Sequence, residues 1–352
     1  LSLVGSEMCI RDRVISIIFD DGALPIFLKT LISIFLIGLI GLFFTRNIKN
    51  DLSQKDGFVI IVMFWIVLSL TGSVPFYLSG MSLIDSVFES MSGITTTGAT
   101  VISSLDGLPE SLLFYRQLLQ WMGGMGLIVL AIAVMPLLGI GGGQIYKTEV
   151  PGAMGEQRLT PRIKETAQAL WLIYFGLTAM CGVLYYLSGM NAFDAISHAM
   201  STVAIGGFST HDESIGFFNS ISIELICICF MLLSAFSFAL HYFAIYKKKP
   251  LKYAFDPEFR FFMSFLLATL LIAVLIGFFV ESDKSPSLRE IIFQTVSMVT
   301  TTGFSISDSS DWPFSMSFLL LIGAFVGACS GSVGGGVKSW RIMIMLNHAY
   351  KN

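Results

Sequence analysis

The sequence predicts an all-α polytopic membrane protein built from repeated helix–pore-loop–helix units. Three observations predict this fold. The 352 residues are 54% hydrophobic and only 13% charged, with a mean hydropathy of +0.77, which is typical of membrane proteins. Apolar segments of spanning length recur along the chain, and a strip rich in threonine and glycine recurs between them.

Seven apolar segments approach or exceed the roughly 20 residues needed to cross a hydrocarbon layer of about 30 Å. They cover residues 26–44, 57–79, 112–139, 165–189, 221–246, 259–281 and 314–349. Charged residues are confined to the ends of these segments, which excludes a large soluble protein with buried helices. The last segment is interrupted by glycines.

The recurring strip covers residues 95–100, then 204–209, then 300–305. An acidic residue lies thirteen positions before the aligned glycine of each strip, and a serine lies six positions before it. The acids are Asp85, Asp194 and Glu290, and the serines are Ser92, Ser201 and Ser297. The stretch between them predicts a short helix of roughly ten residues, with its acid at the favourable N-terminus and its negative dipole end directed at the strip. A polar turn between two helices, the alternative, does not account for three copies in matched context.

Such strips indicate an ion-selectivity filter. A cation that leaves water needs its hydration oxygens replaced, and a ring of backbone carbonyls replaces them. Glycine permits the unusual dihedral angles that this arrangement demands. We expect much of the ion coordination from Thr96, Thr97, Ile205, Gly206, Thr301 and Thr302. We expect the supporting filter backbone to comprise Thr95, Gly98, Ala99, Ala204, Gly207, Phe208, Thr300, Gly303 and Phe304.

The chain divides into six regions in this interpretation. Residues 1–13 match nothing around them and are left unassigned as non-native sequence. Residues 14–56 contain the N-terminal helix, 57–139 the first pore unit, and 140–164 a cytoplasmic link that is rich in glycine and charge. The second pore unit covers 165–252, and the third, with a glycine-rich intramembrane loop, covers 253–352.

Charge predicts the orientation in the membrane. Most of the 21 basic residues lie in the loops opposite the strips, so the positive-inside rule places the strips outside. The strip side is acidic, which raises the local cation concentration. His198 and His211 flank the second strip and are expected to face the outer vestibule. Arg116 is expected to tether the mouth by pairing with an acid such as Glu110.

Four runs carry a resemblance to a known family: 114–117, 120–126, 204–212 and 256–260. In combination they make residues 14–349 similar to the Trk-type bacterial potassium uptake proteins (TrkH-like, within the Trk/Ktr/HKT superfamily). The resemblance implies potassium translocation across the inner membrane by a multi-pass protein whose filters face the periplasm, with K+ as the transported ion and no covalently bound cofactor. It also implies a homodimer in contact with membrane lipid, a cytoplasmic nucleotide-binding regulatory subunit (TrkA-like), no nucleic-acid partner and no enzymatic activity.

The chain departs from the family pattern at both ends. Family members begin with one more helix, where this chain has residues 1–13, and they continue after the third unit with a fourth one. The resemblance thus implies four units around a pseudo-fourfold pore, and we expect a chain truncated at both ends, with three of the four units present and the fourth pore unit missing. Potassium preference rests on the resemblance, because carbonyl rings alone do not fix it. A sodium-permeable transporter of the same superfamily is the alternative.

A glycine-rich run breaks the last apolar segment, because each glycine costs about 1 kcal/mol of helix stability relative to alanine. By resemblance, this break is an intramembrane loop that lies below the filter and acts as a gate. Its residues are Gly327, Ala328, Cys329, Ser330, Gly331, Ser332, Gly334, Gly335, Gly336 and Lys338. Lys338 is expected to snorkel to the inner surface rather than point into the cavity. An intramembrane serine protease, in which Ser330 pairs with His241, is the alternative from a different class, but it does not explain the repeated strips.

Overall fold

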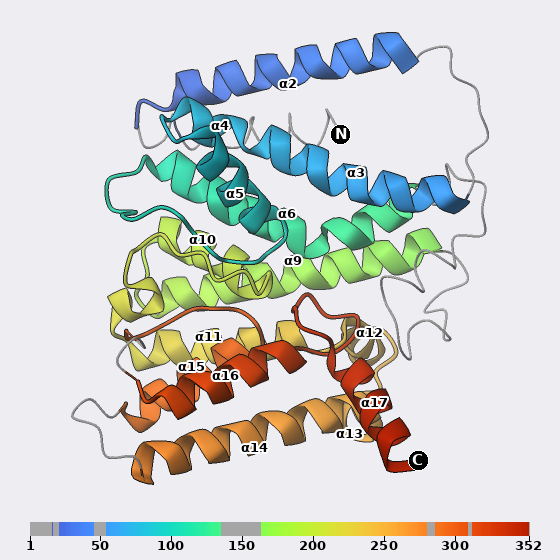
Figure 1. The fold of residues 1–352 in the computed structure, drawn as a ribbon, viewed down its shortest axis with the longest axis vertical. Coiled ribbons are helices and arrows are strands. Elements are labelled where there is room, and N and C mark those ends of the chain that lie inside the picture. The colour runs from blue at the N-terminus through green and yellow to red at the C-terminus, as the bar shows by residue number, and fades with distance from the viewer. Residues whose placement is uncertain are drawn as a thin grey trace. The chain divides into compact units, whose positions relative to one another are not determined.

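The computed structural model describes residues 16, 21–45, 54–134, 163–279, 286–308 and 312–351. Within these ranges every regular element is a helix and no strand occurs (Figure 1). The chain forms two compact units, residues 1–145 and 146–352, which we describe separately. The unassigned residues 1–13 and nearly all of the expected link at 140–164 lie outside the described residues.

The first unit follows the predicted order of outer helix, short helix, strip and inner helix. Its helices are α2 (Leu24–Thr45), α3 (Gln54–Gly72), α4 (Val74–Leu78), α5 (Leu83–Ile94) and α6 (Glu110–Val134). The short helix α5 packs against both α3 and α6, and α2 packs against α4. The strip runs from the end of α5 toward α6.

The second unit contains the same order twice. The first copy comprises α9 (Ile163–Leu187), α10 (Ala192–Val203), the 3-10 helix η1 (Ser214–Phe218), α11 (Ile221–Ala235) and α12 (Phe238–Ile245). After α13 (Lys252–Phe255), the second copy comprises α14 (Pro257–Phe279), α15 (Leu288–Val299), α16 (Phe314–Val326) and α17 (Ser339–Lys351). The short helix α10 packs on α9 and α11, and the short helix α15 packs on α14, α16 and α11 (Figure 1).

Buried apolar side chains hold each short helix between its longer neighbours. In the last copy, Ala273 of α14, Ile291 of α15, and Met316 and Leu320 of α16 form one buried cluster. Other large apolar side chains cover the outward faces of α14 and α16, where they are exposed in the absence of lipid. Many large exposed apolar side chains on one helix are tolerated in hydrocarbon and are unusual on soluble proteins.

The prediction of one continuous second inner helix over 221–246 is wrong. The segment breaks after Ala235, and α11 and α12 meet at 97°. The glycine-rich loop satisfies the backbone groups that the break frees, because the Ala235 carbonyl accepts a bond from the Cys329 N–H (3.1 Å) and the Phe238 N–H donates to the Gly331 carbonyl (2.9 Å). A contact more than 90 residues away in sequence therefore replaces the local helical bonds.

Within the described part of the chain, uninterrupted spans are fewer than the seven predicted segments, of which 112–139 runs into residues that lie outside that part. Among the described residues, 168–187 and 257–279 are long and apolar enough to cross a membrane alone, and the bent pair α11–α12 makes a third if it counts as one span. Shorter apolar helices cover 24–39, 62–78 and 314–326. The last segment is split between α16 and α17, as the glycines predict.

Candidate functional site

Each strip follows a short helix with a common start. The helices α5, α10 and α15 are 12 residues long, which confirms the predicted short helices. In each, the N-cap side chain accepts a hydrogen bond from the N–H of the repeated acid, which lies third in the helix; the caps are Ser82, Asn191 and Ser287. The spacing of a cap residue and an acid three positions later could have been read from the sequence.

The three short helices also share one ending. The second residue after each helix is left-handed, with φ of +55° at Thr96, +52° at Ile205 and +66° at Thr301. The N–H of the residue that follows donates to the carbonyl five residues earlier in the chain. These bonds join Thr97 to Ser92, Gly206 to Ser201 and Thr302 to Ser297, at 2.9, 2.9 and 2.8 Å. This is the Schellman arrangement, in which glycine normally occupies the left-handed position. Threonine or isoleucine there costs on the order of 1–3 kcal/mol, and three equivalent outliers indicate a functional constraint.

A second left-handed residue follows two positions later in each strip. It is the aligned glycine, with φ of +79° at Gly98, +78° at Gly207 and +87° at Gly303. The two positive φ values change the chain direction twice within three residues, so each strip is neither helix nor strand. The sequence indicated the glycines, whereas nothing in it identified the left-handed threonines and isoleucine.

Side chains of the short helices hold the far end of the strips. Ser92 Oγ donates to the Ala99 carbonyl at 2.5 Å, and Ser297 Oγ donates to the Phe304 carbonyl at 2.7 Å. Both carbonyls therefore face their own short helix. The serine that recurs six positions before the glycine in sequence thus fixes the backbone of the strip in the first and third copies.

Threonine hydroxyls tie the near end of the same two strips. Thr95 Oγ1 and Thr97 Oγ1 lie 2.8 Å apart, and Thr300 Oγ1 and Thr302 Oγ1 also lie 2.8 Å apart. Thr95 and Thr300 additionally donate to a helix carbonyl four residues back, at 2.6 and 2.8 Å. The hydroxyls of Thr95, Thr97, Thr300 and Thr302 are thus engaged in hydrogen bonds beside the strips.

Within the second unit, the second and third strips lie against each other. A Cβ atom built on Gly207 would overlap the carbonyl oxygen of Thr302. Just beyond the glycines, the Gly216 N–H donates to the Ser305 carbonyl (3.2 Å), and the Ser305 N–H donates to Ser214 Oγ (3.3 Å). The structure therefore brings together the predicted filter residues of these two strips.

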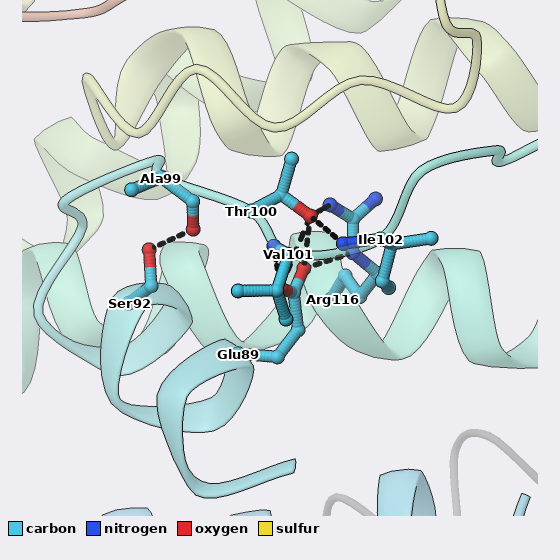
Figure 2. A network of polar contacts seen from close by, with 7 residues as sticks. All are labelled: Glu89, Ser92, Ala99, Thr100, Val101, Ile102 and Arg116. Atoms are coloured by element: carbon cyan, nitrogen blue, oxygen red, sulfur yellow. Dashed lines mark hydrogen bonds and ion pairs between the residues drawn. The ribbon is translucent and has the colours of Figure 1, made fainter. Parts of the chain in front are cut away.

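Arg116 pairs with an acid, but away from any exposed mouth. Its Nε lies 2.8 Å from Glu89 Oε1, and the two side chains are 1% and 0% exposed. Figure 2 shows Glu89 of α5 between Arg116 and the chain that leaves the first strip. The expectation that Arg116 tethers the mouth is therefore wrong, although Arg116 does pair with an acid. The sequence shows several acids near this arginine and does not show which of them is buried beside it.

The expectation that His198 faces the outer vestibule is also wrong. His198 is fully buried; its Nδ1 lies 2.9 Å from the Asp194 carbonyl oxygen and its Nε2 lies 3.0 Å from Ser209 Oγ. His211 is 20% exposed, and its Nε2 lies 3.1 Å from the Asp194 carboxylate. The polar face of α10 points at the strip, so the histidine on that face becomes part of the packing behind it.

The glycine-rich loop contacts the third strip directly. The Gly335 N–H donates to Thr301 Oγ1 at 2.6 Å. A Cβ atom built on Gly334 would lie 3.1 Å from the Thr300 carbonyl oxygen and 3.5 Å from Ile205 Cδ1. The loop therefore lies at the residues where the second and third short helices end.

Glycine is required at the neck of this loop. Gly327 ends α16 with φ +72°, and a Cβ atom there would overlap the Gly335 carbonyl and the Gly336 backbone. The Lys338 ammonium donates to the Gly334 carbonyl and lies 3.4 Å from the Ser332 carbonyl. Its expected snorkelling to the inner surface is therefore wrong, because the loop's own carbonyls hold the amine.

A buried carboxylate that is not part of the loop anchors it. Glu258, in the first turn of α14, is 6% exposed. Its Oε1 accepts from the Ser330 N–H at 2.5 Å and from the Trp340 N–H at 3.1 Å. Sequence reasoning missed this residue, because its partners lie 72 and 82 positions away.

The geometry does not assemble the serine–histidine pair of the protease alternative. His241 Nε2 lies 2.8 Å from the Leu233 carbonyl oxygen, and Nδ1 lies 2.6 Å from the Tyr253 hydroxyl. Both ring nitrogens thus have partners other than Ser330. Within the described residues, no group of three or more histidine, cysteine or acidic side chains is arranged to hold a metal ion.

Comparisons with known proteins agree on one family. A family model described as "TrkH: Cation transport protein" matches residues 23–350. The Trk system potassium uptake protein TrkH of Halomonas elongata is 50% identical over 96% of this chain and 71% of its own length. The protein of the same name from Escherichia coli K12 is 44% identical over 98% of this chain and 72% of its own length. The crystal structure of the potassium transporter TrkH from Vibrio parahaemolyticus superposes with a TM-score of 0.86 at 44% identity, covering 99% of this chain and 73% of that one.

Proposed function

This chain belongs to the TrkH family of cation transport proteins, and from that membership we propose that it moves potassium ions across the bacterial inner membrane through a filter of backbone carbonyls. The observation that carries the proposal is the repetition of one backbone. Three capped short helices each end in a left-handed threonine or isoleucine, followed two residues later by a left-handed glycine. Relatives named as potassium uptake proteins, at 44 to 50% identity, support the choice of ion.

Carbonyls at the left-handed residues and at the residues that follow them form the proposed ion-binding set. These residues are Thr96, Thr97, Ile205, Gly206, Thr301 and Thr302. A potassium ion would exchange its hydration oxygens for these carbonyls. The neighbouring Ala99 and Phe304 carbonyls accept bonds from serines, so they support the strip rather than bind the ion. The C-terminal ends of the three short helices lie at the strips, and their negative dipole ends favour a cation there.

The glycine-rich loop is the proposed gate. Its hydrogen bond to Thr301 and the close approach of Gly334 to the Thr300 carbonyl support a position next to the strips, where the loop would obstruct an ion path. The loop is held by hydrogen bonds to Glu258, to the break between α11 and α12, and to its own neck, rather than by the continuous ladder of a helix.

The membrane orientation and the partners complete the proposal. Basic loops on the side opposite the strips favour strips that face the periplasm in a multi-pass protein surrounded by lipid. The relatives' names refer to a Trk system, which implies more than one component. We extend this to a homodimer controlled by a cytoplasmic nucleotide-binding subunit of the TrkA type, with K+ as transported ion and no bound cofactor.

Ion flux tests the proposal. The product of the complete reading frame that encodes this chain is purified, reconstituted in liposomes and assayed for rubidium uptake in competition with potassium and with sodium. We expect potassium to compete strongly and sodium weakly. Equal competition by sodium would favour the sodium-permeable alternative, and absence of flux in a well-folded preparation would refute a transport function. Complementation of a bacterium that lacks potassium uptake, on low-potassium medium, provides an independent readout.

A further inference from the structure

A polar side chain recurs at one position of the short helices, where it contacts the strip but is not among the proposed ion ligands. Nine residues before the aligned glycine, the short helix carries Glu89 in the first copy and His198 in the second. Two residues after the glycine, the strip carries a hydroxyl, on Thr100 and Ser209 respectively. In both copies the two groups are hydrogen-bonded, Thr100 Oγ1 to Glu89 at 2.9 Å and Ser209 Oγ to His198 Nε2 at 3.0 Å. In these two copies, a buried polar side chain of the short helix thus holds the end of the strip that leads away from that helix.

The hydroxyl of Thr100 has its full set of partners in the first copy. It donates to Glu89, whose two oxygens lie at 2.9 and 3.0 Å. It accepts from the Ile102 N–H at 3.1 Å and from an Arg116 terminal nitrogen at 3.3 Å. A hydroxyl has one proton and two lone pairs, so these contacts fix its position completely, as Figure 2 shows.

Glu89 also holds the backbone next to this hydroxyl. Its Oε2 accepts from the Val101 N–H at 3.2 Å. Because Ser92 holds the Ala99 carbonyl, three consecutive residues of the outgoing strip are bound to side chains of α5 (Figure 2). The carbonyls of the preceding filter residues can then move little toward or away from an ion.

The buried charge of Glu89 requires a partner, which Arg116 provides. Both side chains are buried, and burying two charges costs more than their attraction returns unless further hydrogen bonds satisfy them. An apolar pair would therefore hold α5 against α6 at least as well. What the ion pair adds is a carboxylate locked in one orientation, with oxygens aimed at the strip.

We propose that Glu89, oriented by Arg116, is a positioning residue for the first filter strip and that, through the Thr100 hydroxyl, it sharpens discrimination between potassium and sodium. This inference rests on the proposed function. A strip free to move inward can follow the smaller sodium ion, whereas a strip held at three consecutive residues cannot. Carbonyl rings alone do not fix selectivity, so the rigidity of their support contributes to it.

The test compares ion selectivity in Thr100→Val, which removes the hydroxyl at nearly constant volume, with Thr100→Ser, which keeps it. Thr71→Val is the matched control, because its hydroxyl bonds the Val67 and Leu68 carbonyls of its own helix at 2.9 and 3.1 Å. Each variant of the complete protein is reconstituted, and the ratio of potassium to sodium competition against rubidium uptake is measured. We expect Thr100→Val to lower this ratio on the order of tenfold, the effect of one charge-assisted hydrogen bond. Thr100→Ser and Thr71→Val should keep the wild-type ratio.

An unchanged ratio in well-folded Thr100→Val overturns the proposal, as does an equal loss in Thr71→Val. If Thr100→Val does not fold, Thr100→Ala removes the hydroxyl without adding volume, and the same two results apply to it. Wild-type protein without potassium preference would refute the proposed function, whereas either of the two results above, obtained with a selective wild type, refutes this inference.

Discussion

Replacement of Gly207 by alanine should damage the protein more than the same replacement of Gly303, although the two glycines are equivalent in the repeat. Both have left-handed backbones, with φ of +78° and +87°. Their surroundings differ, because a Cβ atom on Gly207 would overlap the Thr302 carbonyl oxygen, whereas nothing lies within 4 Å of a Cβ atom on Gly303. The pair therefore separates the cost of the backbone conformation from the cost of the contact.

The loss of stability in each variant follows from the cost of the left-handed backbone and the cost of the steric contact. A left-handed alanine costs roughly 1–2 kcal/mol, and this cost applies to both variants. At Gly207 the obstructing atom belongs to the backbone, with the Thr302 carbonyl carbon at 3.2 Å and the Gly303 carbonyl carbon at 3.3 Å from the built Cβ. The neighbouring strip must then shift, which adds about 1–3 kcal/mol, as overpacking typically does.

Thermal unfolding of the purified protein measures the difference. With an unfolding entropy of about 2.1 cal/mol/K per residue, 1 kcal/mol shifts the Tm of a chain of 352 residues by about 1.4 °C, so Gly207→Ala should unfold about 1–4 °C below Gly303→Ala. Rubidium uptake should also fall further in Gly207→Ala, because the shifted atom is a proposed ion ligand. Equal Tm values and equal uptake for the two variants would refute the contact that we infer between the second and third strips.

Three further predictions concern helix packing and the loop. Gly123→Ala should lower the Tm, because its Cβ atom would overlap the Ile94 carbonyl, whereas Gly126→Ala, whose nearest neighbour would lie at 3.8 Å, should not; equal Tm values would contradict this packing. Glu258→Leu should raise basal rubidium efflux several-fold because the Ser330 N–H of the loop and the Trp340 N–H of α17 lose their acceptor, while Glu258→Gln, which keeps an oxygen, should stay near wild type; wild-type efflux in both would show that the anchor does not restrain the loop. Deletion of residues 334–336 should remove an obstruction and raise basal flux, and loss of flux in a well-folded deletion variant would make the segment a required part of the path.

Much of the secondary structure could be predicted because its causes are local. The amphipathic stretch between a repeated acid and a repeated serine predicts a short helix, and α5, α10 and α15 confirm it. The glycine run from Gly327 to Gly336 predicts a break, and the structure shows it between α16 and α17. The ion-binding role of the strips stays a prediction, which the flux measurements test.

The errors share a cause, which is that partners distant in sequence decided the outcome. No proline or glycine marks the bend between α11 and α12 in the sequence. The bend is possible because residues of the glycine-rich loop form hydrogen bonds with the backbone groups that it frees. His198 and Arg116 are polar residues that the sequence favours at a surface, yet partners in the fold bury both. Lys338 binds carbonyls of its own loop because the loop closes on itself.

By itself, the sequence determined the membrane character, the threefold recurrence of helix and strip, and the position of the glycine-rich break, because hydropathy, helix capping and glycine content act over a few neighbouring residues. Only the tertiary structure decided which side chains support the strips and how the loop is held. Threonine and isoleucine accept a left-handed backbone at Thr96, Ile205 and Thr301 only where the surrounding structure offsets the strain. A carboxylate such as Glu89 is buried only where an arginine from another helix meets it.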